Sequence, residues 1–162
     1  MQLLIVRHGA AVERGTPGIP DDERPLTPEG EKKMRQAARG LAKLLDKPYA
    51  ILTSPLPRAH RTAEILSEAF GTVTLTATSS LSYGSIEELF ELLKEYPQKA
   101  LIGVVGHEPY LSSLLARLIG AQDGGALAFK KGGVALVDVP GAPGAGGALT
   151  LFLPPKVLRE IG

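Results

Sequence analysis

The segment 100–105 reads ALIGVV and carries no polar side chain, and this run constrains the fold more than any other feature of the sequence. A strand that is apolar on both faces fits the centre of a parallel sheet that helices cover on each side. Short strands are also predicted at 2–6 (QLLIV), 49–53 (YAILT) and 72–77 (TVTLTA). Strands that alternate with helices along a chain indicate an α/β layer fold with a mostly parallel sheet.

Amphipathic helices are predicted between these strands. The predicted helical segments are 27–46, 54–70, 85–96, a segment containing Leu111 to Leu118, and a short one at 156–161. Thr27 suits an N-cap, and Ser85 with Glu88 forms a capping box. Near the end, strands at 134–139 and 148–153 flank a Gly/Pro loop, which predicts a hairpin that adds an antiparallel edge. We therefore expect one domain over 1–162, a three-layer sandwich with helices on both faces of the sheet.

Composition excludes several classes of function. The chain has no cysteine, which rules out disulfides, thiolate catalysis and cysteine-based zinc sites. Its 18 basic and 17 acidic residues give a net charge of +1, which argues against a dedicated nucleic-acid or membrane-surface binder. No segment approaches the ~20 apolar residues of a membrane span. The opening apolar run is too short for a signal peptide, so we expect a cytoplasmic protein.

Basic residues follow three of the predicted strands. Arg7 and His8 follow the first, Arg58 comes shortly after the second, and His107 follows the central one. In an open α/β sheet, ligands bind beyond the carboxyl ends of the strands, so these four side chains should converge there. Two guanidinium groups suit an oxyanion with several oxygens, and a phosphoryl group is the obvious candidate. One histidine can then act as the nucleophile while the other holds the transferring oxygens.

A metal site is the alternative interpretation of two distant histidines. Arg7 and Arg58 would repel a cation, and no carboxylate cluster accompanies either histidine. We therefore expect no metal. The remaining histidine, His60, lies on a predicted helix beside Arg61 and is interpreted as a surface or rim residue.

Four motifs in this order, RHG, RPLTPEG, SPLPRAHRTAE and GHEP, resemble those of the histidine phosphatase superfamily, which has the phosphoglycerate mutase-like fold. The resemblance runs from Met1 to about Leu153. The small size, the short spacing between motifs and the absence of a long inserted cap are most similar to the SixA-type phosphohistidine phosphatases.

The resemblance implies a role for each matching residue. His8 would be the nucleophile that becomes phosphorylated. Arg7, Arg58 and His107 would bind the phosphoryl oxygens, with His107 expected to be protonated. Arg24 is near enough in sequence to reach the rim of the site. The implied mechanism needs neither a metal nor an organic cofactor.

The sequence departs from the family pattern at the general acid. Many members carry a Glu or Asp after the third strand or beside the second histidine, whereas this loop reads SLSYGS. Glu87, Glu88 and Glu108 remain as candidates, but each lies where a helix begins, and acidic residues are common there.

A missing acid favours a phosphohistidine substrate. An alkoxide leaving group benefits from protonation by ~10²–10⁴-fold. A phosphohistidine whose other ring nitrogen is protonated can instead expel a neutral imidazole without an enzymic acid. Short loops also predict an open cleft that could admit a histidine from another protein. The expected function is therefore a phosphatase acting on a phosphorelay or phosphocarrier protein in signal transduction. A small-molecule phosphomonoesterase, a mutase and a non-catalytic phosphate-binding module are the alternatives.

Overall fold

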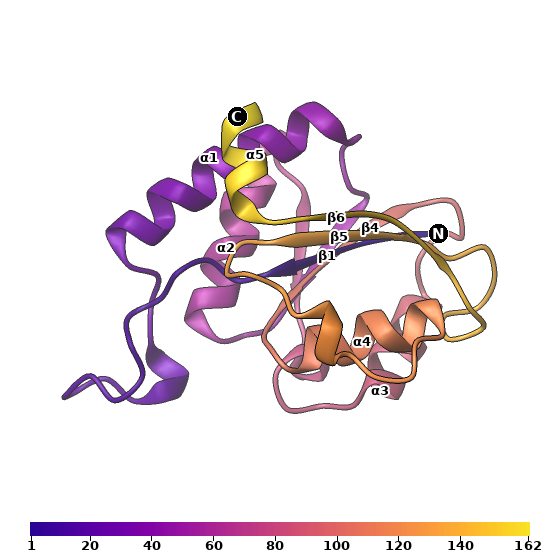
Figure 1. Ribbon diagram of the computed structural model, residues 1–162, viewed down its shortest axis with the longest axis horizontal. Coiled ribbons are helices and arrows are strands. Elements are labelled where there is room, and N and C mark those ends of the chain that lie inside the picture. The colour runs from indigo at the N-terminus through magenta and orange to yellow at the C-terminus, as the bar shows by residue number, and fades with distance from the viewer.

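A six-stranded sheet runs through the middle of the protein (Figure 1). The structure is a computed structural model that describes residues 1–162. The strands are β1 (Gln2–Arg7), β2 (Ala50–Thr53), β3 (Thr74–Ala77), β4 (Leu101–Gly106), β5 (Val134–Asp138) and β6 (Ala148–Leu153). Their order across the sheet is β3-β2-β4-β1-β5-β6. The first four are parallel, while β5 and β6 add the antiparallel edge that the sequence predicted.

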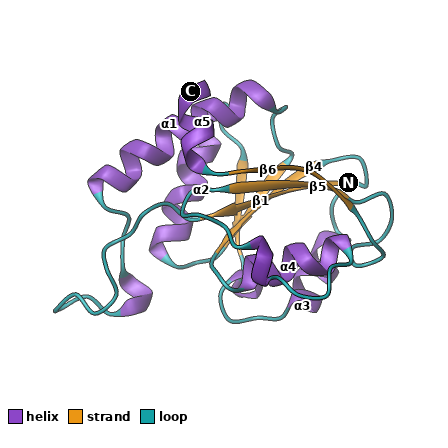
Figure 2. Cartoon of the chain, in the orientation of Figure 1, coloured by secondary structure: helices purple, strands orange, loops and turns teal.

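Helices cover both faces of this sheet, which confirms the predicted three-layer fold (Figure 2). They are α1 (Pro28–Leu44), α2 (Pro57–Ala69), α3 (Ile86–Leu93), α4 (Tyr110–Ile119) and α5 (Pro155–Ile161). The apolar sides of α1, α2 and α5 form one buried cluster with the sheet, and those of α3 and α4 form a second. Short 3₁₀ turns at Asp21–Glu23, Ser79–Leu81 and Gly125–Leu127 complete the elements.

The central position of β4 explains its composition. Ile102, Val104 and Val105 are fully buried because the two clusters pack on opposite faces of the strand. The predicted caps also form, since Thr27 accepts a hydrogen bond from Gly30 N and Ser85 makes the capping box with Glu88. These local signals place the starts of α1 and α3 within one residue of the prediction.

The first strand is longer than predicted. Arg7 was expected just after the strand, but it belongs to β1 and pairs in register with Gly106 at the end of β4. The backbone therefore holds Arg7 as rigidly as the apolar residues before it. A loop of about twenty residues follows β1, lies at the left of Figure 1, and returns at a bridge between Ala11 and Leu26.

Helix α1 lies very close to this loop. A Cβ added at Gly30 would come within 2.0 Å of the Ala10 carbonyl oxygen, so only glycine allows this approach. The close packing fixes the chain just after His8. No helix in the structure combines the length and hydropathy that a bilayer crossing requires.

Candidate active site

His8 and His107 lie side by side at the carboxyl ends of β1 and β4. Their ring centroids are 5.1 Å apart, at an interplanar angle of 55°. The register of the two strands produces this pairing, because Arg7 is opposite Gly106 and the histidines follow immediately. The backbone N–H of His8 also donates to the Gly106 carbonyl at 3.1 Å. His8 is only 6% exposed, so its ring sits in the floor of the site.

The surroundings of His8 define which ring nitrogen is free. Its Nδ1 lies 2.7 Å from the Gly9 carbonyl oxygen, which can only accept a hydrogen bond. The hydrogen of the neutral ring therefore sits on Nδ1, and Nε2 keeps its lone pair. That lone pair is what a nucleophilic imidazole requires.

His107 is oriented by a residue to which the sequence analysis gave no role. Its Nε2 lies 2.7 Å from the hydroxyl of Ser54, the residue after β2. The same hydroxyl accepts from Leu56 N at 3.2 Å, so its own hydrogen is available to His107. This pattern favours a neutral His107 with its hydrogen on Nδ1, and that nitrogen is buried with no hydrogen-bond partner.

The two predicted arginines each use one nitrogen to fix their position. Arg7 Nη1 donates to the Phe129 carbonyl at 2.5 Å, and Arg58 Nη1 donates to the Asp21 carbonyl at 2.9 Å. The Nε atoms of both side chains are buried and lack a partner. Together with His107 Nδ1, these are the only buried side-chain nitrogens or oxygens without a hydrogen bond. Buried polar groups are nearly always paired, so three unpaired ones in one place point to an anionic ligand.

Both histidines are neutral near pH 7. Burial, followed by the charges of the neighbouring arginines, lowers the pKa of His107 to about 4. The pKa of His8 is lowered to about 3 by burial and by the charges of His107, Arg58 and Arg7. Its hydrogen bond to the Gly9 carbonyl acts in the opposite direction. The expectation of a protonated His107 is therefore wrong for the ligand-free protein. The sequence could not show how completely the two rings are buried.

The loop after β1 brings further charges to the site. Arg24 is 9% exposed, donates to the Val12 carbonyl at 2.7 Å and pairs with Asp21 at 2.8 Å. Its charge contributes to the lowered pKa of His107, so it does lie close to the site. Burial alone would raise the pKa of Asp21, but hydrogen bonds from Arg24 and Arg14 hold it below its ordinary value. Asp21 is thus ionised and unsuited to donate a proton.

Asp22, in the same loop, is a further carboxylate that the sequence analysis did not consider. The hydrogen bond with Asp22 raises the pKa of the Tyr83 hydroxyl, and the charge of Arg58 acts on the same hydroxyl. The loop after β1 and the SLSYGS loop therefore meet beside Arg58. No local sequence signal would have paired them, because the contact depends on the path of two irregular loops.

The three acidic residues that the sequence singled out all have structural partners. Glu87 pairs with Arg117 at 3.0 Å, and Glu88 caps α3 through the Ser85 backbone. Glu108 accepts from the N–H and hydroxyl of Ser112, and its other oxygen accepts from Phe129 N at 2.6 Å.

Glu108 thereby supports the site indirectly. The Phe129 carbonyl holds Arg7, and Glu108 holds the amide of the same residue. Its carboxylate is occupied by three donors, which is typical of a group that positions its neighbours.

Thr62 connects α2 to the loop after β1. Its hydroxyl donates to the Arg58 carbonyl at 2.7 Å and accepts from Gly9 N at 3.0 Å. Ser54 and Thr62 both belong to the motif SPLPRAHRTAE, from which only Arg58 was assigned. His60 in the same motif is half-exposed and lies 3.6 Å from Glu64, as its surface interpretation predicted. No group of three or more His, Cys, Asp and Glu side chains is arranged to hold a metal ion.

One family model and one curated relative match this chain over more than half of its length. The profile of the histidine phosphatase superfamily (branch 1) matches residues 3–98. An uncharacterized protein of Picosynechococcus sp. is 35% identical over 138 residues, which cover 83% of this chain and 82% of that protein.

Among solved structures, the protein histidine phosphatase SixA complexed with tungstate is similar with a TM-score of 0.82. It is 24% identical, and the match covers 98% of this chain and 99% of that one. The alpha-ribazole phosphatase of Shigella flexneri has a TM-score of 0.73 at 19% identity, covering 96% and 97% of the two chains. At these identities the likeness concerns the fold.

Proposed function

Because this chain belongs to the histidine phosphatase superfamily (branch 1), we propose that it removes the phosphoryl group from a phosphohistidine of another protein. Members of this superfamily generally act as phosphatases through a phosphohistidine intermediate. The intermediate in this chain would form on His8. No metal or organic cofactor takes part in the proposed reaction.

In the first step, the lone pair of His8 Nε2 attacks phosphorus in line with the leaving group. The new P–N bond forms as the P–N bond of the substrate breaks, and the departing ring takes the electron pair. The other nitrogen of that ring carries a proton, so the ring leaves as neutral imidazole. The Gly9 carbonyl supports this step because it accepts from Nδ1–H, 2.7 Å away, and so stabilises the positive charge that develops on the ring.

Arg7, Arg58 and His107 would hold the equatorial oxygens of the transferring group. The donors are the Nε–H groups of the arginines and Nδ1–H of His107, which lack protein partners. Donors that are already fixed in place stabilise the transition state without a cost of reorganisation. A neutral His107 can fill this role, since one N–H suffices.

In the second step, water attacks phosphorus and the bond to His8 Nε2 breaks. The electron pair returns to the ring, which becomes neutral again, and inorganic phosphate carries away the proton of the water. The burial that lowers the pKa of His8 favours this return, because it destabilises the cationic ring of the intermediate.

The leaving group decides the substrate class. Glu87, Glu88 and Glu108 are held by structural partners, and Asp21 is held ionised by Arg24 and Arg14. A site with few available acids suits a neutral imidazole, which leaves without being protonated, better than an alkoxide.

The observation that carries the proposal is the set of unpaired buried nitrogens around the free Nε2 of His8. A direct test compares kcat/KM on a phosphohistidine peptide with values on 4-nitrophenyl phosphate, glycerol phosphate and phosphoglycerate. We expect efficient turnover of the peptide, slow turnover of the aryl ester and poor turnover of the alkyl esters.

Two results would replace this proposal. Efficient turnover of an alkyl ester would make the protein a small-molecule phosphatase or mutase. Binding of phosphate without turnover of any substrate would make it a phosphate-binding module.

A further inference from the structure

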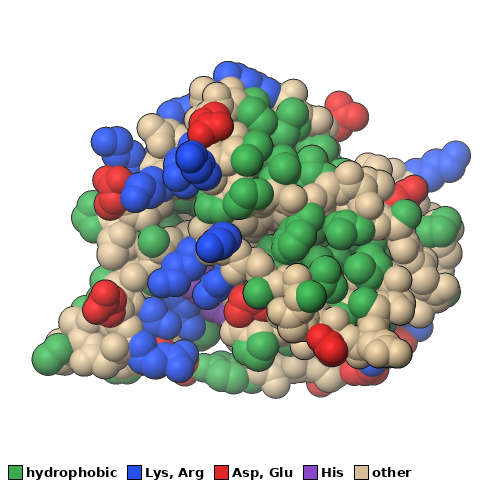
Figure 3. All heavy atoms as spheres, viewed as in Figure 1, with side chains coloured by type: hydrophobic (Ala, Val, Ile, Leu, Met, Phe, Trp, Pro, Cys, Tyr) green, Lys and Arg blue, Asp and Glu red, His purple; other side chains and the backbone are tan.

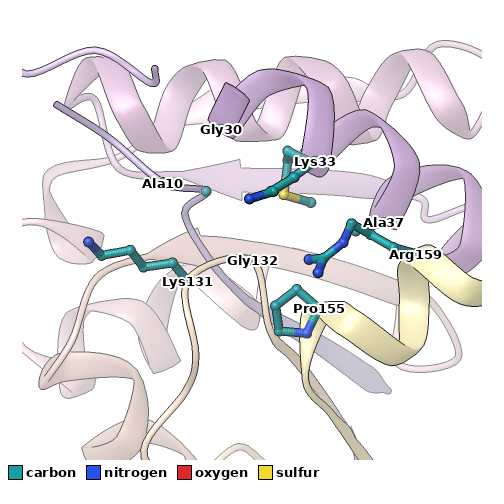
Figure 4. Close-up of a pocket in the computed structure, with 10 residues that line it drawn as sticks. Ala10, Gly30, Lys33, Ala37, Lys131, Gly132, Pro155 and Arg159 are labelled. Atoms are coloured by element: carbon teal, nitrogen blue, oxygen red, sulfur yellow. The ribbon is translucent and has the colours of Figure 1, made fainter. Parts of the chain in front are cut away.

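A basic hollow lies beside the backbone that follows His8, where Gly9 and Ala10 form part of its lining. It is a shallow hollow with a cavity volume of about 40 Å³, and Gly132 also forms part of its lining. The full lining is Gly9, Ala10, Gly30, Lys33, Met34, Ala37, Lys131, Gly132, Pro155 and Arg159. Figure 4 shows the Lys33 and Arg159 side chains pointing into the space above Pro155 and Gly132, while the Lys131 side chain extends outward from it.

The charges of this hollow are not balanced by acidic groups in its lining. Lys33, Lys131 and Arg159 are its only charged residues. Lys33 has one solvent-exposed partner, Glu29, at 3.4 Å, whereas Lys131 and Arg159 form no ion pair. Exposed pairs of this kind contribute little energy, so all three cations remain available to an anion.

The hollow is physically joined to the phosphoryl site. The backbone N–H of Gly132 donates to the carbonyls of Arg7 and His8 at 3.0 Å. Three residues earlier, the Phe129 carbonyl accepts from Arg7 inside the site. A single short segment therefore lines both regions. On the face shown in Figure 3, Lys and Arg side chains form a band that passes beside a histidine.

A lining of backbone and flexible cations suits a carboxylate side chain better than an apolar group. Gly132 has φ +79° and brings no side chain into the space, so an entering group can approach the main chain. Lysines with mobile ammonium groups attract charge over distance without requiring one fixed geometry. This is the chemistry of a docking contact, in contrast to the fixed donors around His8.

We propose that this hollow binds acidic side chains of the protein that presents the phosphohistidine, next to the point where the phosphoryl group enters the site. The inference rests on the proposed function and adds the kind of surface that the partner carries. Substrates with glutamate or aspartate near the phosphohistidine would be preferred, and the preference would weaken as salt screens the charges.

The test uses two synthetic peptides, each with one histidine phosphorylated by phosphoramidate. One carries three glutamates beside the histidine, and the other carries three glutamines. We expect kcat/KM to be about tenfold higher for the glutamate peptide at low salt, as is typical of electrostatic steering. The ratio should approach one in ~0.5 M NaCl. Equal values at low salt would overturn the proposal.

Charge-reversal variants locate the effect. Lys33→Glu and Arg159→Glu should each lower the ratio between the two peptides several-fold. Lys32→Glu is the matched control, because Lys32 neighbours Lys33 on α1 but lines a different groove with Arg35 and Arg39. The control should keep the wild-type ratio. If Lys32→Glu lowers the ratio as much as Lys33→Glu, the preference reflects net charge, and the hollow is not the docking site. Lys33→Gln repeats the test if the reversal impairs folding.

A binding experiment separates this inference from the proposed function. The unphosphorylated glutamate peptide is titrated into ¹⁵N-labelled wild-type protein, and the amide signals of Ala10, Gly30 and Gly132 should shift. Shifts in these amides would support docking even if neither phosphorylated peptide is hydrolysed. In that case the proposed function would be wrong, while the docking proposal would stand. Shifts with inorganic phosphate but none with the peptide would make the hollow a small-anion site and overturn the proposal.

Discussion

Two groups of cations flank the backbone at His8, and they differ in how deeply they are buried. Arg58 is 5% exposed and Arg7 is half-buried, and each has one nitrogen fixed by a carbonyl and another without a partner. Lys33 and Lys131, in the hollow, are exposed. The positive charges of the site and those of the hollow are therefore suited to different functions.

The difference teaches what burial adds to a positive charge. A fixed donor in a dry site acts strongly on the charge of a transition state. A mobile, hydrated ammonium group acts mainly on the rate of encounter and is screened by salt. We therefore expect substitutions in the site to affect the turnover of every substrate, and substitutions in the hollow to affect discrimination between substrates.

The largest effect is expected for His8→Ala. Without the Nε2 nucleophile, no covalent intermediate forms, and turnover of both phosphohistidine and aryl phosphate should be lost. Acid-labile, base-stable labelling by a phosphoryl donor should also disappear. If the variant keeps more than a few per cent of wild-type activity, water attacks the phosphorus of the substrate directly. The covalent mechanism on His8 would then be wrong.

Arg58→Ala should lower kcat by about 10²-fold or more on every substrate, as expected for the loss of one transition-state donor. Arg39→Ala, an exposed arginine on α1, provides the control for loss of a positive charge. A loss that appears only with acidic peptides would mean that Arg58 acts in docking, as the cations of the hollow do. The proposed difference between the two groups of cations would then be wrong.

The sequence could place the four residues near the strand ends because the apolar run that marks each strand is a local signal. Apolar runs located β1, β2 and β4, and parallel pairing then set Arg7 opposite Gly106 and the histidines beside each other. The hydrophobic patterns also located every helix, with errors of a few residues at the ends.

Contacts made by irregular segments could not be predicted. The carbonyls that hold Arg7 and Arg58 come from Phe129 and Asp21, which lie in loops without any periodic pattern. The protonation of His107 depends on its burial, which follows from the whole fold. The hollow was missed for the same reason, because α1, α5 and the segment before β5 are far apart in sequence.

A smaller effect is expected for Ser54→Ala. Loss of the hydroxyl removes the bond that favours the Nδ1–H form of His107, and kcat should fall about five- to tenfold, the worth of one hydrogen bond. Imidazole ¹⁵N shifts should change from one tautomer to a mixture. Ser113→Ala, which removes an exposed hydroxyl from α4, is the control. An unchanged tautomer in Ser54→Ala would contradict the positioning role.

The carboxylates near the site should matter less still for phosphohistidine. Asp22→Asn and Glu87→Gln should each change its turnover by less than about threefold, because a neutral imidazole needs no proton. The measurement is kcat/KM on phosphohistidine peptide and on glycerol phosphate. A loss of ~10²-fold on glycerol phosphate in Asp22→Asn, with efficient wild-type turnover of that ester, would identify a general acid and replace the proposed substrate class.

The last prediction concerns stability, and it tests the burial of the two histidines of the site. The pKa values of His8 and His107 are lowered to about 3 and about 4, so the folded protein keeps both rings neutral where the unfolded chain takes up protons. The free energy of unfolding should therefore fall as the pH drops from about 6.5 towards 4. The loss is up to about 1.4 kcal/mol per pH unit for each histidine.

Urea unfolding at pH 7 and pH 5, in chloride buffers without phosphate or sulfate, measures this loss. His8→Gln and His107→Gln should each lose less stability between the two pH values than the wild type does, because each removes one group that protonates only on unfolding. His60→Gln is the control and should show the wild-type loss, since this histidine is half-exposed beside Glu64 and lies outside the site. The carboxylates are the same in all of these proteins, so their contribution to the pH dependence of stability cancels in the comparison. An equal loss in all four proteins would mean that the site histidines are protonated in the folded state, and the distinction between a dry site and a hydrated hollow would fail.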